Sequence, residues 1–113
     1  METTWEFLFS DEGLELWLGN LISGSVEIKE RYKTTDGTEG VVRVLKSQSH
    51  IRLTWKKKDW NNFSTLQIRV ISTKDKTTIS FHQEKLRTDQ QRAEMKTHWQ
   101  KVIGKLTEEL ASL

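Results

Sequence analysis

Residues that could perform acid–base or metal chemistry are few in this sequence and lie far apart along it. The three histidines, His50, His82 and His98, share no ligand spacing, and a three-histidine metal site would need all of them to converge. Glu84 lies two residues after His82, a spacing more typical of a surface pair than of an acid–base couple. There is no cysteine, which excludes disulfides, thiolate catalysis and zinc–thiolate sites and fits a reducing cytoplasm.

The motifs of the common enzyme classes do not occur in the sequence. It has no glycine-rich phosphate loop, no nucleophile elbow and no pair of carboxylates at a convincing spacing. We therefore expect a protein that is not an enzyme, with no catalytic residues, no metal and no cofactor. The alternative left open is a cryptic enzyme that uses Glu30 or a histidine in a cavity.

Composition narrows the class of protein further. The 113 residues are the length of one domain, which we expect to span 1–113. No apolar run approaches the roughly 20 residues of a membrane helix, and the N-terminus has no basic and apolar signal segment. The formal net charge is only +2, so bulk charge does not favour nucleic acid or acidic lipid as a partner. We expect a cytoplasmic protein with no nucleic-acid and no membrane partner.

One local segment is both basic and aromatic. Lys56, Lys57 and Lys58 are followed by Trp60 and Phe63, and such a loop could contact phosphates and stack on a base. A solvated hairpin tip explains the same residues more simply, and we take that as the expectation.

The elements that must position any site can be predicted from hydrophobic spacing. The stretch from Thr4 to Leu18 predicts helix, with Ser10 capping a second short segment. Alternating apolar and polar residues then predict five strands, and one apolar face per strand indicates an antiparallel sheet. The strands are expected at 26–33, 41–46, 51–56, 66–70 and 78–82.

The last segment predicts one long amphipathic helix from about Thr88 to the C-terminus. Thr88 and Gln91 have the spacing of a capping box. Apolar residues recur at helical spacing in a stripe long enough to lie across the apolar face of the sheet. The stripe consists of Met95, Trp99, Val102, Ile103, Leu106, Leu110 and Leu113. Gly104 costs about 1 kcal/mol against alanine in a helix, and close packing on the sheet is a reason for glycine there.

Four stretches of the sequence carry motifs in a fixed order: 5–19 with its terminal Trp-Leu-Gly, 36–42 with Asp-Gly and Gly-Val-Val, 51–55 with Thr-Trp, and 77–106 with the last strand and His-Trp. In these motifs and in the order of its elements the chain resembles the START-like (SRPBCC) superfamily and, within it, the branch named after the activator of heat-shock protein 90 ATPase. The resemblance implies an α+β helix-grip fold, in which a curved antiparallel sheet wraps a long C-terminal helix. It also implies a small hydrophobic molecule held between sheet and helix, although some members act on a chaperone and a few are enzymes.

The sequence departs from the family at its start. Family members usually begin with a strand before the first helix, but here Trp5 follows Met1 almost at once. The resemblance then implies a truncated form, an open sheet edge, or an edge that another chain fills. Because an uncovered edge can pair with another chain, a protein partner or a homodimer through this edge is an expectation.

Large side chains on the concave face of the predicted sheet define the candidate ligand cavity. Rings that cannot interdigitate leave apolar gaps that can accept a hydrophobic guest. The expected lining is Trp17, Glu30, Tyr32, Trp55, Phe81, Met95 and Trp99. For the apolar members an ordinary filled core is the alternative, and Glu30 is either a polar group in the cavity or solvated at a strand end.

The sequence therefore predicts a non-enzymatic binding module for a small hydrophobic or amphipathic molecule. The alternative is a protein–protein interaction module of the co-chaperone kind. An enclosed cavity would favour the first function, and a filled core with an exposed apolar patch would favour the second.

Overall fold

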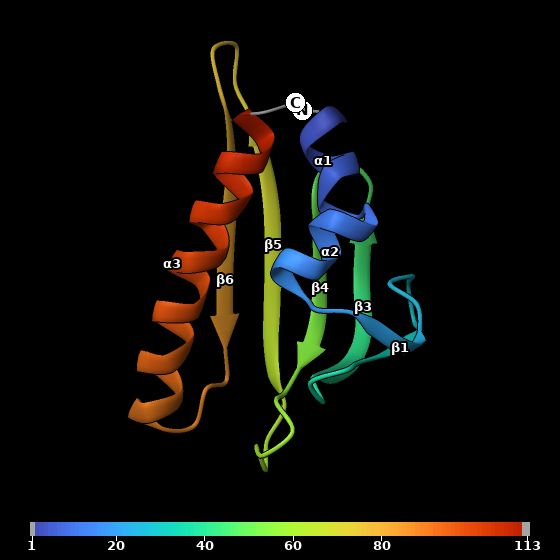
Figure 1. The fold of residues 1–113 in the computed structure, drawn as a ribbon, viewed down its shortest axis with the longest axis vertical. Coiled ribbons are helices and arrows are strands. Elements are labelled where there is room, and N and C mark those ends of the chain that lie inside the picture. The colour runs from blue at the N-terminus through green and yellow to red at the C-terminus, as the bar shows by residue number, and fades with distance from the viewer. Residues whose placement is uncertain (1, 112–113) are drawn as a thin grey trace.

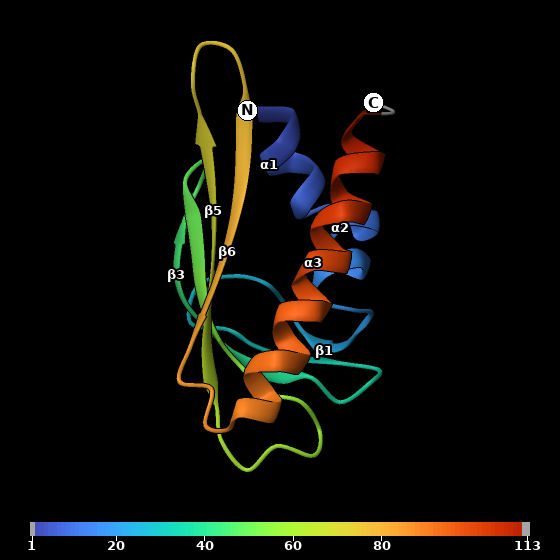
Figure 2. The same ribbon diagram turned by 90° about the vertical axis from the view of Figure 1, so that its left-hand side faces the viewer.

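A six-stranded antiparallel sheet forms the body of the structure, a computed structural model that describes residues 2–111. The strands follow one another in the sheet in chain order: β1 (Leu21–Gly24), β2 (Arg31–Thr34), β3 (Glu39–Lys46), β4 (His50–Trp55), β5 (Ser64–Ser72) and β6 (Thr77–Glu84). One face of the curved sheet is covered by α1 (Glu2–Leu8), α2 (Asp11–Trp17) and α3 (Asp89–Ala111), as Figure 1 and Figure 2 show. This is the helix-grip arrangement that the resemblance predicts.

The N-terminal helices form where the apolar spacing predicts them. Ser10 accepts a hydrogen bond of 3.1 Å from the N–H of Gly13 and so caps α2. Trp5 of α1 and Trp17 of α2 are buried. The two helices therefore cover the part of the sheet that α3 leaves free, as Figure 1 shows.

The first predicted strand is wrong in its extent. Of the expected 26–33 segment only residues 31–33 pair in the sheet, as part of β2. A short strand that sequence reasoning missed, β1, lies beside it. The chain turns before β2 because Lys29 adopts a φ of 67° and its N–H bonds the carbonyl of Val42 at 2.8 Å. Ile28, an apolar residue of the expected strand, is consequently 50% exposed.

A bulge in β3 changes which of its side chains face the core. The register between β3 and β4 shifts between Val42 and Val44. Val42 is fully buried, whereas Val44 is 39% exposed. An extra residue in one strand reverses the alternation of side chains beyond it. The regular alternation expected for strand 41–46, which would put Val42 and Val44 on the same face, is therefore wrong.

The three remaining strands are regular, and β4 and β5 supply most of the buried apolar side chains of the sheet. β4 pairs with β5, and β5 with β6, without any register shift. The inward side chains Ile51, Leu53, Leu66 and Ile68 are at most 1% exposed. Here the alternation in the sequence predicts the buried face correctly.

The long C-terminal helix is confirmed, and its stripe lies on the sheet. Thr88 Oγ1 accepts a hydrogen bond of 3.0 Å from the N–H of Gln91, as the capping box predicts. In a capping box, the Gln91 side chain would accept from the N–H of Thr88. Here Gln91 Oε1 accepts instead from the N–H of Arg87, one residue earlier. The stripe residues that are buried are Met95, Trp99, Val102 and Leu106.

Two expectations about α3 need correction. Ile103 was placed in the stripe but is 37% exposed at its margin. A Cβ on Gly104 would meet nothing within 4 Å, so close packing on the sheet does not explain this glycine. The last stripe residue, Leu113, lies outside the described residues. None of the described helices is long and apolar enough to cross a membrane.

Candidate functional site

Trp55, at the end of β4, is the centre of a group of rings beneath α3. Its ring centroid lies 5.3 Å from that of Trp60, 5.8 Å from that of Trp99 and 6.4 Å from that of His98. Phe81 of β6 stacks on Trp99 at 4.9 Å. We call these five residues the aromatic cluster. It joins the loop after β4, the last strand and α3 in one packed unit.

The indole N–H of Trp55 is buried and has no hydrogen-bond partner among the described residues. Trp55 as a whole is only 2% exposed. A buried donor without an acceptor costs on the order of 1–3 kcal/mol, and such groups in native proteins usually have a protein or water partner. The aromatic cluster therefore contains one donor that a bound molecule or a water could satisfy.

A chain of hydrogen bonds holds the aromatic cluster in place. Trp99 Nε1 donates to Gln83 Oε1 at 2.7 Å, and Gln83 Nε2 donates to Ser64 Oγ at 2.8 Å. Ser64 Oγ donates in turn to the carbonyl of Trp55 at 2.6 Å. These three bonds connect α3, β6, β5 and β4, so the rings are positioned by polar contacts as well as by packing.

Four of the seven predicted lining residues lie in or beside the aromatic cluster. Trp55, Phe81 and Trp99 belong to it, and Met95, one turn before Trp99 on α3, is 1% exposed. These side chains pack against one another in the core between sheet and helix. Their role as lining of a ligand cavity stays a prediction.

Two other predicted residues are buried but placed elsewhere. Trp17 Nε1 donates to the carbonyl of Leu8 at 2.7 Å, which ties α2 to α1. Tyr32 Oη donates to the carbonyl of Thr54 at 2.5 Å. Burial, assisted by the nearby Glu39 carboxylate, raises the pKa of Tyr32 well above its usual range. Both polar tips are thus already satisfied by backbone carbonyls.

Glu30 does not line the space between sheet and helix. It is exposed and lies in the turn before β2, not within a strand. Its N–H bonds the carbonyl of Glu27 and its carbonyl accepts from the N–H of Val42, both at 3.0 Å. The turn that shortens β2 therefore places Glu30 in solvent, and its inclusion among the cavity residues is wrong.

His98 is the titratable member of the aromatic cluster. Its ring is half-buried and lies 4.6 Å from that of Trp99. Burial lowers the pKa of His98, and the ammonium group of Lys57 adds to this effect, while the carboxylates of Asp36 and Glu94 oppose it. The imidazole is therefore mostly neutral at pH 7.

The other histidines lie away from this site. His50 Nδ1 lies 2.8 Å from Ser49 Oγ, and His82 Nε2 lies 2.9 Å from Glu84 Oε1 in an exposed pair. The surface-pair interpretation of His82 and Glu84 is thereby confirmed. In residues 2–111, no three His, Asp or Glu side chains are grouped so that they could hold a metal ion.

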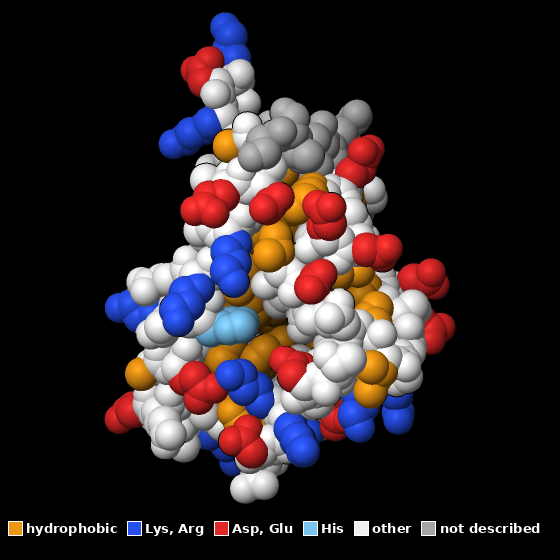
Figure 3. All heavy atoms as spheres, viewed as in Figure 1, with side chains coloured by type: hydrophobic (Ala, Val, Ile, Leu, Met, Phe, Trp, Pro, Cys, Tyr) orange, Lys and Arg blue, Asp and Glu red, His pale blue; other side chains and the backbone are white. Residues whose placement is uncertain are grey.

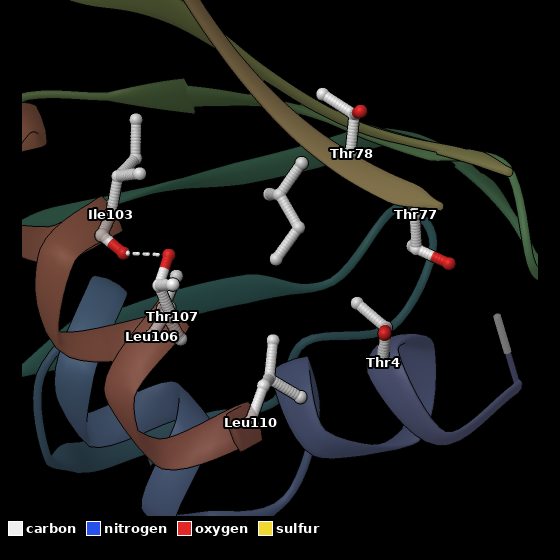
Figure 4. A pocket seen from close by; sticks show the side chains of 8 residues that line it. Thr4, Thr77, Thr78, Ile103, Leu106, Thr107 and Leu110 are labelled. Carbon is white, nitrogen blue, oxygen red and sulfur yellow. Dashed lines mark hydrogen bonds between the residues drawn. The ribbon is translucent and has the colours of Figure 1, made fainter. Parts of the chain in front are cut away.

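A separate groove opens between the start of β6 and the end of α3, as Figure 4 shows. Its volume is about 360 Å³. The side chains come from α1, β6 and α3 and are Thr4, Thr77, Thr78, Ile79, Ile103, Leu106, Thr107 and Leu110. We call it the edge groove. Its walls are aliphatic and its polar groups are threonine hydroxyls, one of which, on Thr107, already donates to the carbonyl of Ile103 at 2.8 Å.

Sequence reasoning missed the edge groove as a site. Ile103 and Leu106 belong to the predicted stripe, Ile79 lies in the strand expected at 78–82, and threonines at a strand end carry no functional signal. The one usable hint was the open sheet edge, because apolar side chains next to an unpaired strand have no neighbour to cover them.

β6 has an unpaired outer side in the described part of the chain. The N–H of Val70 in β5 bonds the carbonyl of Ser49 on the β4 side at 2.8 Å. Backbone groups alternate in an antiparallel ladder, so Ile79, the β6 partner of Val70, directs its N–H and C=O away from β5. Phe81, two residues further, does the same. The edge groove therefore lies beside unused backbone donors and acceptors.

Family comparison agrees with this architecture along nearly the whole chain. The model of the family described as "Activator of Hsp90 ATPase homolog 1-like protein" matches residues 1–111. No curated protein matches the chain.

Solved structures share the fold at low sequence identity. DynU16, from the dynemicin biosynthetic locus, has a TM-score of 0.80 at 16% identity over 97% of this chain and 42% of its own. CalU16 from Micromonospora echinospora has a TM-score of 0.80 at 13% identity, over 95% of this chain and 66% of its own. The Aha1 dimer from Colwellia psychrerythraea has a TM-score of 0.70 at 19% identity, over 93% and 83%. The chain thus spans less than two thirds of the first two proteins.

Proposed function

Because the chain belongs to the Activator of Hsp90 ATPase homolog 1-like family, we propose that it is a non-enzymatic binding module for a small hydrophobic or amphipathic molecule. The molecule lies between the sheet and α3, in the edge groove. The observation that carries the proposal is the combination of aliphatic walls and threonine hydroxyls around a space of about 360 Å³.

The dimensions and chemistry of the edge groove support this proposal. Small-molecule sites have volumes of roughly 300–1,000 Å³ and mostly apolar linings with a few polar groups. Ile79, Ile103 and Leu110 supply the apolar surface, and Thr4 and Thr77 are polar residues of the same lining. An aliphatic chain or a fused ring system with one hydroxyl or carboxyl group fits these features.

The aromatic cluster has a second role in the proposal. A guest longer than the edge groove would have to open the packing along α3 to reach Trp99 and Trp55, where the N–H of Trp55 lacks an acceptor among the described residues. Figure 3 shows hydrophobic side chains between α3 and the N-terminal helices, on the face where such a guest enters. Only a guest that opens this packing contacts the predicted lining residues Trp55, Phe81, Met95 and Trp99.

The non-enzymatic part of the proposal rests on the side chains around the site. The edge groove is lined by aliphatic residues and threonines, with no carboxylate, histidine or lysine among them. His98, in the aromatic cluster, is the group on which a cryptic enzyme would depend. The lack of cysteine in the sequence supports the cytoplasm as the compartment of this single-domain module.

Calorimetric titration with dodecanoate and with the flavonoid naringenin tests the proposal. Ile103→Gln replaces a partly exposed groove residue by a polar one, and we expect its affinity to fall by about tenfold, the effect of losing one apolar contact. Ile22→Gln is the matched control because Ile22 is 58% exposed on β1, at the opposite edge of the sheet. Equal affinities of both variants and the wild type would contradict the edge groove as the site.

A second candidate function is protein–protein interaction through the outer side of β6. The unused backbone groups of Ile79 and Phe81 favour it, since such edges accept a further strand. The fold neighbour from Colwellia psychrerythraea is described as a dimer, which supports a second copy of this chain as the partner. If the chain has this function, one extended segment of the partner pairs with the outer edge of β6.

Sedimentation velocity over a range of concentrations tests the homodimer. Ile79→Pro removes an N–H that faces outward, so it blocks strand addition without breaking the β5–β6 ladder. The expected result is a concentration-dependent dimer for the wild type and a monomer for Ile79→Pro. A wild-type chain that sediments as a monomer throughout would contradict this candidate and leave the small-molecule proposal untouched.

A further inference from the structure

The side of β2 and β3 turned away from the core carries a groove that the proposed function does not use. Arg31 and Lys33 of β2 are exposed, while Tyr32 between them is buried, so the two cations point away from α3. Together with Val41 and Arg43 of β3 they line a space of about 610 Å³. We call it the basic groove. Its volume lies within the range of small-molecule sites.

The basic groove has an excess of positive charge. Its lining contains three cations, Arg31, Lys33 and Arg43, against one carboxylate, Glu39. Glu39 is itself 4.0 Å from the ammonium group of Lys56. In the described part of the chain none of the three cations forms an ion pair. The guanidinium groups in particular are free to form bidentate hydrogen bonds with an oxyanion.

An exposed aromatic ring borders the same groove. Phe63 lines it and is 49% exposed. The ammonium group of Lys56 lies 5.7 Å from the Phe63 ring centroid, and the same nitrogen donates to the carbonyl of Trp60 at 3.1 Å. The structure thus divides the basic, aromatic segment noted in the sequence: Trp60 is buried, and Phe63 faces the groove. A flat apolar group can stack on such a ring.

The base of the groove is rigid because the backbones of β3 and β4 approach each other closely at Gly40. A Cβ on Gly40 would meet the carbonyl oxygen of Thr54 at 1.8 Å and Tyr32 Oη at 2.7 Å. Tyr32 Oη and Thr54 are hydrogen-bonded at 2.5 Å, and the N–H of Val41 donates to Thr54 Oγ1 at 2.8 Å. The cations and the ring are therefore mounted on a fixed surface, as a binding site requires.

We propose that the basic groove binds an amphipathic anion: a flat apolar body that stacks on Phe63 and carries a phosphate or carboxylate held by Arg31, Lys33 and Arg43. The site is distinct from the edge groove, which lies at the other end of the sheet between β6 and α3. The groove selects by two features at once, so a neutral ring or a free inorganic anion binds it much more weakly than a molecule that has both.

Titration calorimetry with four probes tests this proposal: 1-naphthyl phosphate, 1-naphthoate, 1-naphthol and inorganic phosphate. We expect saturable binding of 1-naphthyl phosphate, with 1-naphthol and inorganic phosphate at least tenfold weaker. The affinity for 1-naphthyl phosphate should fall as salt is raised. Comparison of 1-naphthyl phosphate with 1-naphthoate shows which oxyanion the groove prefers.

Substitutions at exposed positions separate the two features without disturbing the fold. Arg43→Ser should lower the affinity for 1-naphthyl phosphate about tenfold, and Phe63→Ser should lower it about fivefold. Arg87→Ser is the matched control, since Arg87 is exposed in the loop before α3, outside the lining of the groove. Amide NMR shifts should map to Val41 and Phe63 and not to Ile103. Unchanged affinity in both Arg43→Ser and Phe63→Ser, or shifts confined to the edge groove, would overturn the proposal.

Discussion

Trp99 Nε1 donates a 2.7 Å hydrogen bond to Gln83 Oε1, and this contact fixes the middle of α3 to the end of β6. The ring of Trp99 also stacks on Phe81 of the same strand. Gln83 Nε2 in turn donates a hydrogen bond to Ser64 Oγ of β5. α3 is thus held on the last strands of the sheet by one residue that combines packing with a directed polar bond.

Substitutions of Trp99 should separate the contribution of its buried ring to stability from that of its hydrogen bond. Trp99→Ala empties a buried aromatic site and should lower the free energy of unfolding by about 3–5 kcal/mol. Trp99→Phe keeps a ring and loses the hydrogen bond, which should cost about 1–2 kcal/mol. Urea denaturation measures both. A loss under about 1 kcal/mol for Trp99→Ala would mean that α3 is not anchored by this residue.

Gly104→Ala should stabilise the protein. Gly104 is exposed in the interior of α3 and a Cβ there meets nothing within 4 Å, so only the helix propensity changes. Alanine should raise the free energy of unfolding by roughly 0.5–1 kcal/mol. A lower melting temperature for Gly104→Ala would show that this position is covered by another element or chain.

Gly40→Ala should have the opposite effect. The added Cβ would collide with the carbonyl oxygen of Thr54 at 1.8 Å, a backbone atom that cannot move aside without separating β3 from β4. We expect a loss of about 2–3 kcal/mol in chemical denaturation, and a weaker Tyr32–Thr54 bond. Gly104→Ala in the same experiment is the control, because its added Cβ meets no neighbouring atom within 4 Å.

His98 should make stability depend on pH on the acid side of neutrality. Its pKa is lowered in the folded protein by burial and by Lys57, so between that value and about 6.5 the unfolded chain binds the proton more readily. Above about pH 6.5 His98 is neutral in both states and does not lower the free energy of unfolding. As the pH falls below that value, protonation of the unfolded chain lowers the free energy of unfolding. His98→Phe should lose less stability than the wild type between pH 7.5 and 5.5. Parallel losses in both proteins would contradict the assignment.

The sequence predicts the fold best where spacing and burial act together. The stripe of α3 could be found because Met95, Trp99 and Leu106 recur at helical spacing and face one sheet. The strand expected at 26–33 failed because a left-handed Lys29 and its bond to Val42 override local alternation. Such a turn depends on a contact distant in sequence, which periodicity does not contain.

The candidate site could be predicted only in part. Trp55, Phe81 and Trp99 lie together because large rings on one face of the sheet and on the covering helix have few other places to go, but their role as cavity lining stays a prediction. The edge groove was missed because Ile79 and Ile103 have the same apolar pattern as core residues. Whether an apolar residue is covered depends on the neighbour of its strand, and here β6 has none on its outer side in residues 2–111.

The most direct test of small-molecule binding between sheet and helix is an amide NMR titration of the protein with dodecanoate. The account predicts saturable shifts at Thr4, Ile79, Ile103 and Leu110, which line the edge groove. Thr107→Trp places a large ring in the groove from an exposed position and should abolish these shifts while leaving the rest of the spectrum unchanged. Shifts that persist in Thr107→Trp, or that appear only outside the edge groove and the aromatic cluster, would contradict the account.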